Sequence, residues 1–136
     1  MRTVITFGTF DVLHIGHINI LRRAKEYGDR LIVGVSSDAL NFSKKQRFPV
    51  YTEFDRTEII SNLKFVDEVF LEESLELKGE YIKRYNADLL VMGNDWEGRF
   101  DIFKELCDVV YLPRTEGIST TELITQIKNI TDYCAA

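Results

Sequence analysis

The sequence predicts a single α/β domain with about five parallel strands, and two observations carry this prediction. Short runs of β-branched and aromatic residues alternate with segments of helical periodicity along the whole chain. The run at residues 31–35 is apolar throughout, as is typical of strands in a parallel sheet with helices on both faces. Together they indicate a doubly wound, Rossmann-like sheet, in which ligands bind beyond the carboxyl ends of the strands.

The elements follow one another in a regular order. Strands are expected at residues 3–7, 31–35, 66–71, 89–92 and 109–112. Helices are expected from Gly16 to the C′ residue Gly28, from Thr52 to Leu63, at 75–85 with Asn86 at the end, at 100–106 and from Ser119 to about Ile130. Residues 36–51 are polar and aperiodic and contain Pro49, so we expect a loop there.

Length and composition set outer bounds on the protein. The 136 residues suit one domain, residues 1–130, followed by a tail, residues 131–136. A net charge of −5 argues against a general nucleic-acid-binding surface. The sequence shows neither a membrane-length apolar run nor a signal peptide, so we expect a cytoplasmic protein without membrane insertion. Cys107 and Cys134 have no metal-binding or redox spacing and are expected to be reduced.

Residues 8–17 form the stretch around which the chain is organised. They follow the first predicted strand, open the first predicted helix, and contain both histidines of the chain, His14 and His17. The first amides of a helix lack intrahelical partners, and together with the helix dipole they attract anions. Imidazoles at the same place can donate hydrogen bonds to phosphoryl oxygens. The stretch therefore predicts a nucleotide-phosphate site.

Two other interpretations of these histidines compete with the phosphate site. With Asp11 they could bind a metal, but zinc usually needs three or four protein ligands and no further one lies nearby, so we expect no protein-built metal site. They could also only cap the helix. The surrounding Gly, Thr and Asp residues in a loop after a strand favour the phosphate site over capping alone.

Three more polar stretches follow predicted strands and should meet at the same edge of the sheet. Lys44, Lys45 and Arg47 lie in the first, and they form either a solvated charge run or a mobile loop that places an ammonium on a phosphate. The spacing does not choose between these interpretations. The second, residues 93–98, is either a simple turn or the place where Asp95 binds a ribose or base.

The third stretch, Arg114 to Thr121, joins an arginine to several hydroxyl groups. Ser119 is a good N-cap for the last helix, which is the simplest interpretation. The functional interpretation adds that an arginine fork, hydroxyls and free helix amides can surround one anion, because guanidinium matches phosphate geometry.

The motifs at 8–17 and 114–120 together resemble those of a known family. Gly8-Thr9-Phe10-Asp11…His14-x-Gly16-His17 with Arg114-Thr115-Glu116-Gly117-Ile118-Ser119-Thr120 is similar to the cytidylyltransferases of the H-x-G-H nucleotidyltransferase superfamily, over residues 1–130. The resemblance implies transfer of CMP from CTP to sn-glycerol 3-phosphate, which gives CDP-glycerol and pyrophosphate. It also implies Mg²⁺, a homodimer, and a role in cell-surface polymer synthesis, such as teichoic acid or capsule.

Site residues follow from the resemblance where the motifs match. The catalytic residues would be His14, His17, Lys44 and Arg114. CTP would contact these histidines and Arg114 together with Gly8, Thr9, Phe10, Asp95, Thr115, Ser119 and Thr120. The acceptor would contact Asp11, Lys44, Arg56, Lys64 and Asp67. Lys64 stands where the family has an arginine, and the region of Leu75 lacks a tryptophan that is often found there.

The chemistry of such a transfer needs no general base. A phosphate monoester has a second pKa of about 6, so it is already a dianionic nucleophile near neutral pH. Three alternatives remain open from the sequence. The enzyme could use another polyol phosphate such as ribitol phosphate, or phosphocholine or phosphoethanolamine; it could be an adenylyltransferase, such as a flavin-adenylating enzyme; or the chain could be a non-catalytic nucleotide-binding module.

Overall fold

The computed structural model describes residues 1–130 and has a five-stranded, fully parallel sheet. Its strands are β1 (Thr3–Gly8), β2 (Arg30–Ser36), β3 (Glu68–Glu72), β4 (Leu89–Gly93) and β5 (Asp108–Leu112). Their order is β3-β2-β1-β4-β5, so the chain first builds one half of the sheet outward from β1 and then the other. The predicted fold class is confirmed. The predicted tail, residues 131–136, lies outside the described residues.

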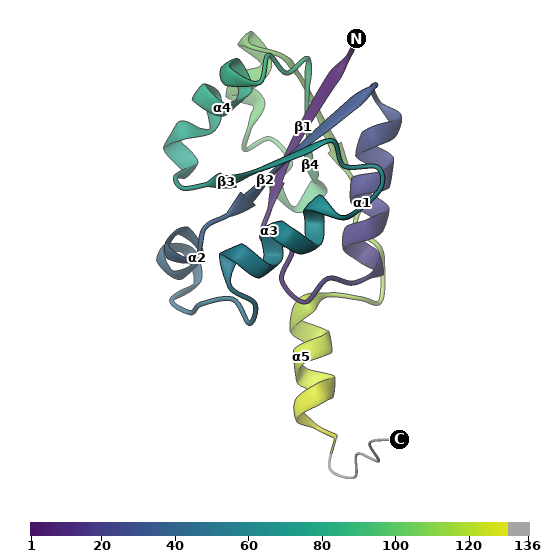
Figure 1. Ribbon diagram of the computed structural model, residues 1–136, viewed down its shortest axis with the longest axis vertical. Helices are drawn as coiled ribbons and strands as arrows, with labels where there is room; N and C mark the ends of the chain where they lie inside the picture. Colours follow the sequence, from purple (N-terminus) through teal and green to yellow (C-terminus); the bar gives the residue numbers. More distant parts are fainter. Residues whose placement is uncertain (131–136) are drawn as a thin grey trace.

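Helices cover both faces of the sheet. They are α1 (Ile15–Glu26), α2 (Asp38–Lys45), α3 (Glu53–Ser61), α4 (Lys78–Arg84) and α5 (Thr120–Lys128), with 3₁₀ turns η1 (Leu75–Leu77), η2 (Asn94–Trp96) and η3 (Asp101–Glu105). In Figure 1, α1 and α3 lie on one side of the sheet and α4 on the other, whereas α5 projects from the body. Within residues 1–130 there is no helix that is both long and apolar enough to cross a membrane.

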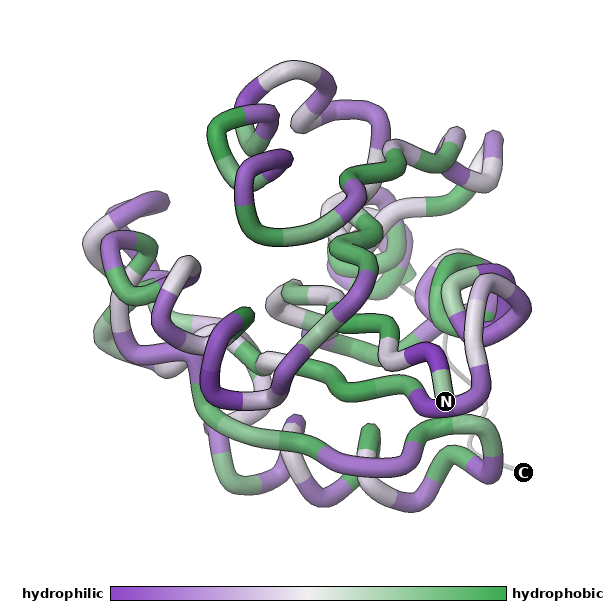
Figure 2. The backbone as a smooth tube through the Cα atoms, turned by 90° about the horizontal axis from the view of Figure 1, so that it is seen from above, coloured by the Kyte–Doolittle hydropathy of each residue, from purple (hydrophilic) through white to green (hydrophobic). Residues whose placement is uncertain are grey.

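Two apolar clusters hold these layers together. One joins alternate strand residues such as Val4 and Val33 to Leu21 of α1 and Ile60 of α3, and all four are fully buried. The other joins the opposite face of the strands to α4. Figure 2 shows the hydrophobic strands in the middle of the molecule with helices on either side. The central strands are largely apolar because both of their faces are covered, whereas the edge strands β3 and β5 carry charged residues at their ends.

The order in which strands are added to the sheet reverses between β1 and β4, and the site lies there. β1 pairs with β2 over six residues, from Thr3 to Gly8, but with β4 only from Val4 to Thr6. The carboxyl ends of β1 and β4 therefore separate and leave a crevice. Such a topological switch point is where ligands bind in open parallel sheets.

The expectation of a loop over residues 36–51 is wrong in part, because α2 occupies Asp38–Lys45. Ser37 caps this helix by accepting a hydrogen bond from the Leu40 amide, and Gln46 ends it in the left-handed conformation. The helix buries only Leu40 and the polar Asn41. With a single buried apolar residue in eight, the segment shows no apolar periodicity from which a helix could be predicted.

Other boundaries differ in detail. The expected helix at 75–85 is divided into η1 and α4, and the one at 100–106 is the 3₁₀ turn η3. Gly28 does follow α1, but it has no positive φ. It is glycine because a Cβ there would lie 2.6 Å from the Arg2 carbonyl oxygen.

Candidate active site

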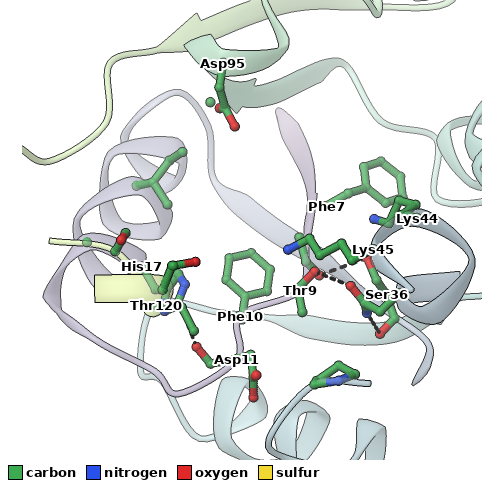
Figure 3. A pocket seen from close by; sticks show the side chains of 18 of the residues that line it. Phe7, Thr9, Phe10, Asp11, His17, Ser36, Lys44, Lys45, Asp95 and Thr120 are labelled. Carbon is green, nitrogen blue, oxygen red and sulfur yellow. Dashed lines mark hydrogen bonds between the residues drawn. The ribbon is translucent and has the colours of Figure 1, made fainter. Parts of the chain in front are cut away.

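A cavity of about 610 Å³ opens at the switch point and collects most of the predicted site residues. Its lining includes Gly8, Thr9, Phe10, Asp11, His14, His17, Lys44, Asp95, Arg114, Thr115, Ser119 and Thr120. Figure 3 shows His17 and Thr120 on one side of the cavity, Lys44 and Lys45 on the opposite side, and Asp95 on a third. Segments that are more than a hundred residues apart in sequence thus form one site.

The two histidines are fixed by the start of α1. His14 is the N-cap residue, and its Nδ1 accepts a hydrogen bond from the Gly16 amide at 3.0 Å. His17 Nδ1 accepts from the His14 amide at 3.2 Å, and the two rings stack with centroids 3.8 Å apart. Because each Nδ1 is an acceptor, the proton of each neutral ring lies on Nε2. Capping therefore leaves an Nε2–H donor free on each histidine.

Both imidazoles are neutral near pH 7. Burial, followed by the charge of Arg114, lowers the pKa of His14. For His17, burial, then His14, then Arg114 lower the pKa to about 3. Each ring therefore presents one hydrogen-bond donor without a formal charge of its own, and each can donate to an anionic oxygen.

This arrangement predicts a pH dependence of stability. His17 has a pKa of about 3 when folded and about 6.5 when unfolded, so the unfolded chain binds more protons between these values. The contribution to stability is fully present above pH 6.5 and is lost as the pH falls towards 3, by up to about 1.4 kcal/mol per pH unit. Urea unfolding at pH 7, 6 and 5 should show this slope, and His17→Gln should flatten it. An equal slope in the variant would contradict the assignment.

The loop between β1 and α1 holds its shape with unusual backbone angles. Phe10 and Val12 have φ values of 54° and 48°, a region that bulky residues rarely adopt. The Phe10 ring packs edge-on against His17, with centroids 5.6 Å apart. It lies so close to Gly8 that a Cβ there would be 2.7 Å from it. Strain of this kind concentrates where structure positions functional groups.

The Asp11 carboxylate is occupied by backbone groups rather than open to an acceptor. It accepts hydrogen bonds from the amides of Val50 at 2.7 Å, Tyr51 at 2.9 Å and Val12 at 3.1 Å. Its own carbonyl accepts from Thr120 Oγ1 at 2.8 Å. Although Asp11 lines the cavity, its hydrogen bonds show a structural role: the carboxylate holds the loop that follows α2, and the carbonyl holds the start of α5.

Removal of the Asp11 carboxylate should therefore loosen one loop. We expect Asp11→Ala to lower the free energy of unfolding by about 1–3 kcal/mol, because three part-buried amides lose a charged acceptor. Hydrogen exchange should show faster exchange of the Val50 and Tyr51 amides. Asp29→Ala is the control: this exposed carboxylate accepts from the Arg2 amide, and its loss should cost much less. Unchanged exchange at Val50 and Tyr51 would contradict this role.

The opposite wall carries cations from the end of α2. Lys44 is half-buried, and burial lowers the pKa of its ammonium while the charge of Glu72 raises it. Lys45 and Arg47 also line the cavity. α2 is tied to the first loop by Thr9 Oγ1, which donates to Asn41 Oδ1 at 2.7 Å. The structure thus places the basic cluster at the cavity rather than on a remote solvated face.

The last predicted stretch supplies a guanidinium and a helix start. Arg114 Nη1 lies 3.9 Å from Asp95 Oδ2, and both side chains are about half exposed. Ser119 Oγ accepts from the Glu122 amide at 3.1 Å, so it is the N-cap of α5 as the simplest interpretation held. Thr115 Oγ1 accepts from Asn19 of α1 at 3.0 Å, which joins this stretch to the histidine helix.

Three residues predicted to bind the acceptor do not line this cavity: Arg56, Lys64 and Asp67. Arg56 has no exposed surface. Its guanidinium donates to the carbonyls of Tyr51, Thr9 and Ser36 and to Asp38 Oδ1. Asp67 binds Lys25 and the Leu31 amide, and Lys64 is exposed on the surface. We therefore correct their assignment: Arg56 stabilises the fold through buried hydrogen bonds, and Lys64 and Asp67 lie on the surface beside β3.

Sequence reasoning missed a buried ion pair in the cavity wall. Lys78 Nζ lies 2.6 Å from Glu72 Oε2, and each side chain is only 2% exposed. The ammonium lies 3.7 Å from the centroid of the Phe7 ring and 5.0 Å from that of Phe100. Glu72 is the last residue of β3, so the rule that ligands bind beyond strand ends was the available signal.

Neutral imidazole donors and facing cations suit a phosphoryl group whose charge changes as it is transferred, and they indicate the nucleotidyltransferase class. Comparison with known families narrows this class. The chain belongs to the cytidylyltransferase-like family, which matches residues 5–126, so the resemblance noted in the sequence is confirmed.

Individual relatives agree with the family assignment. The chain is 48% identical to the glycerol-3-phosphate cytidylyltransferase of Bacillus subtilis (strain 168), over 96% of this chain and all of that protein. The Staphylococcus aureus enzyme of the same name is 46% identical over 90% and 92% of the two chains. An FAD synthase of Pyrococcus abyssi is 33% identical over 93% of each. Among solved structures, a lipopolysaccharide core biosynthesis protein from Thermoplasma volcanium matches with a TM-score of 0.76 and 26% identity, over 85% of this chain and 99% of that one.

Proposed function

We propose that the protein transfers CMP from CTP to sn-glycerol 3-phosphate and releases pyrophosphate. The observation that carries the proposal is one cavity lined by His14, His17, Lys44 and Arg114, with His17 and Lys44 on opposite sides of it (Figure 3). The substrates come from the near-full-length relatives that are named glycerol-3-phosphate cytidylyltransferase.

The reaction joins the acceptor phosphate to the α-phosphate of CTP and separates that α-phosphate from the β-phosphate. An oxygen of the acceptor phosphate forms a bond to the α-phosphorus of CTP, and the bond from that phosphorus to the β-phosphate oxygen breaks. The Nε2–H groups of His14 and His17 donate to the α-phosphoryl oxygens, while Arg114 and the first amides of α5 hold the leaving pyrophosphate. Catalysis then consists of alignment and stabilisation of charge, and the dianionic acceptor needs no base.

The two substrates occupy different ends of the cavity in this proposal. The triphosphate lies between the histidine wall and Arg114, because helix amides and the guanidinium converge there. The acceptor lies toward Lys44 and Lys78, where β2 and β3 end and the buried ammonium lines the wall. Its phosphate then faces the α-phosphorus across the cavity.

Mg²⁺ fits this site as a companion of the triphosphate rather than as a resident metal. No group of three or more His, Cys, Asp or Glu side chains suited to a metal occurs within residues 1–130. Of the cavity carboxylates, Asp11 and Glu72 are occupied by hydrogen bonds, which leaves the half-exposed Asp95. Magnesium commonly binds substrate phosphates with few protein ligands, and it would neutralise charge on the leaving pyrophosphate.

Two alternatives keep some support. FAD synthases among the relatives show that this fold also serves adenylyl transfer, although the relatives with higher identity are cytidylyltransferases. Ribitol phosphate or another polyol phosphate would suit the same cations. A cationic head group such as choline would favour aromatic faces, but the Lys78 ammonium already occupies those of Phe7 and Phe100, and Leu75 lines the cavity where the resemblance predicted a tryptophan. The homodimer, the cytoplasmic location, the absence of nucleic-acid partners and the role in cell-surface polymers stay predictions.

A comparison of kcat/KM between pairs of substrates tests the proposal. We expect kcat/KM to be highest for CTP among the nucleoside triphosphates, and for glycerol 3-phosphate over ribitol 5-phosphate and phosphocholine. A base site that hydrogen-bonds cytosine rejects other bases because its buried polar groups go unpaired. The measurement is pyrophosphate release with each pair. Faster release with ribitol 5-phosphate would overturn the named acceptor, and no release with any acceptor would overturn the enzymatic function.

A further inference from the structure

The Glu72–Lys78 pair is an unusual part of a phosphate site. Both side chains are buried, and burial of an ion pair usually contributes little net stability because both charges lose water. A carboxylate near a phosphate also repels it. Glu72 therefore needs an explanation beyond the stability of the fold.

The surroundings of Lys78 show what the carboxylate does. Burial lowers the pKa of the Lys78 ammonium, and the neighbouring charge of Lys44 lowers it further. Glu72 raises this pKa, through its charge and through its hydrogen bond. The faces of Phe7 and Phe100 also favour a cation but carry no formal charge.

Glu72 also faces Lys44, the other lysine at this end of the cavity. Its charge raises the pKa of Lys44, whereas Lys45 and Arg56 lower it. The carboxylate is itself fixed by Ser36, whose Oγ lies 3.4 Å from Glu72 Oε1. One anchored carboxylate thus supports the charge of two ammonium groups that repel each other.

We propose that Glu72 is a positioning residue that holds the Lys78 ammonium charged and directed at the acceptor phosphate. The proposal rests on the proposed function, since it assigns Lys78 to the acceptor end of the cavity. Glu72 itself does not touch the substrate in this arrangement. Both side chains line the cavity, and the Glu72 carboxylate holds the Lys78 ammonium at 2.6 Å, so the phosphate would bind the ammonium and not the carboxylate.

The first test is Glu72→Gln, which keeps the shape and the hydrogen-bond acceptor but removes the charge. Lys78 should then lose its proton at lower pH, so the KM for glycerol 3-phosphate should rise roughly tenfold or more and should rise further between pH 7 and 9. The KM for CTP should stay within about twofold of the wild type. Above pH 7 the acceptor is already dianionic, so its own titration does not produce the trend.

Glu73→Gln is the matched control, because it removes the same charge from the next residue, which is exposed. It should leave both KM values and their pH profile unchanged. An acceptor KM for Glu72→Gln that falls, or that keeps the wild-type pH profile, would overturn the proposal. Thermal unfolding and CTP binding by calorimetry show that the variants are folded.

A double-variant cycle tests whether Glu72 acts through Lys78. If it does, Glu72→Gln combined with Lys78→Gln should be no worse for the acceptor than Lys78→Gln alone. Additive losses would mean an independent role and would contradict the proposal.

An NMR titration of the Lys78 ammonium gives a readout that does not require turnover. The pKa of Lys78 should be lower in Glu72→Gln than in the wild type, and an unchanged pKa would refute the role of the carboxylate. If the pKa shifts as expected but no acceptor supports pyrophosphate release by the wild type, the proposed function fails and the effect of Glu72 on Lys78 stands.

Discussion

Replacement of His17 by alanine is expected to lower kcat by about 10²–10³-fold in a protein that still folds. The imidazole presents one Nε2–H donor to the α-phosphoryl group, and loss of one preorganised donor at a developing charge typically has this effect. The KM for CTP should change less than kcat, because the bond strengthens most as charge develops in the transition state. Steady-state kinetics with CTP and glycerol 3-phosphate measure both quantities.

His17 also has a structural task, and the control must separate it from the catalytic one. His17 is the N3 residue of α1, and its Nδ1 accepts a hydrogen bond from the amide of the N-cap residue His14. The loss of this bond in His17→Ala should cost about 1 kcal/mol of stability. Glutamine at N3 can accept that amide, as it does in capping boxes, so His17→Gln should regain the stability without regaining the rate. Near-normal kcat in a folded His17→Ala would show that the donor is not needed.

Gly16→Ala is expected to lower kcat/KM by on the order of 10²-fold with little net change in stability, because the lost His14 cap and the better helix propensity of alanine, each about 1 kcal/mol, offset each other. A Cβ at this position would lie 2.7 Å from His14 Cε1 and 2.9 Å from Nδ1, so the ring must move. A displacement of about 1 Å of a catalytic group can cost this much. The backbone itself tolerates alanine, since Gly16 lies in α1 without a positive φ, and alanine favours the helix by about 1 kcal/mol.

Gly79→Ala is the matched control for this variant. Gly79 also lies in a helix, α4, but a Cβ there would meet only the Phe103 and Leu106 side chains, which do not line the cavity. Its activity should match that of the wild type. A Gly16→Ala enzyme with full activity would mean that the position of the His14 ring is not critical.

The sequence predicted strands and helix starts best where the residue pattern of a segment matches its surroundings in the folded protein. The central strands are largely apolar because both of their faces are covered, and Thr52 and Ser119 are N-caps as their residue types suggest. α2 escaped prediction because it depends on a cap and a buried asparagine rather than on an apolar face.

The errors at the site have a different origin. Family resemblance assigned Arg56 to the acceptor, whereas its environment depends on carbonyl groups from three separate segments of the chain that no local pattern reveals. The Glu72–Lys78 pair was missed for the same reason, because two ordinary charged residues become a buried pair only when β3 and α4 meet. Burial of charge is a tertiary property.

Arg56 has a practical consequence for anyone who wishes to engineer this enzyme. Its guanidinium connects the loop after β1, the end of β2 and the segment before α3 by hydrogen bonds to Thr9, Ser36 and Tyr51. These three segments therefore have to be kept or exchanged together. A chimaera that exchanges one of them with a relative to alter acceptor choice must import a backbone carbonyl at the same point in space. Lysine could not substitute for the arginine, because a single ammonium cannot span acceptors spread along a planar fork.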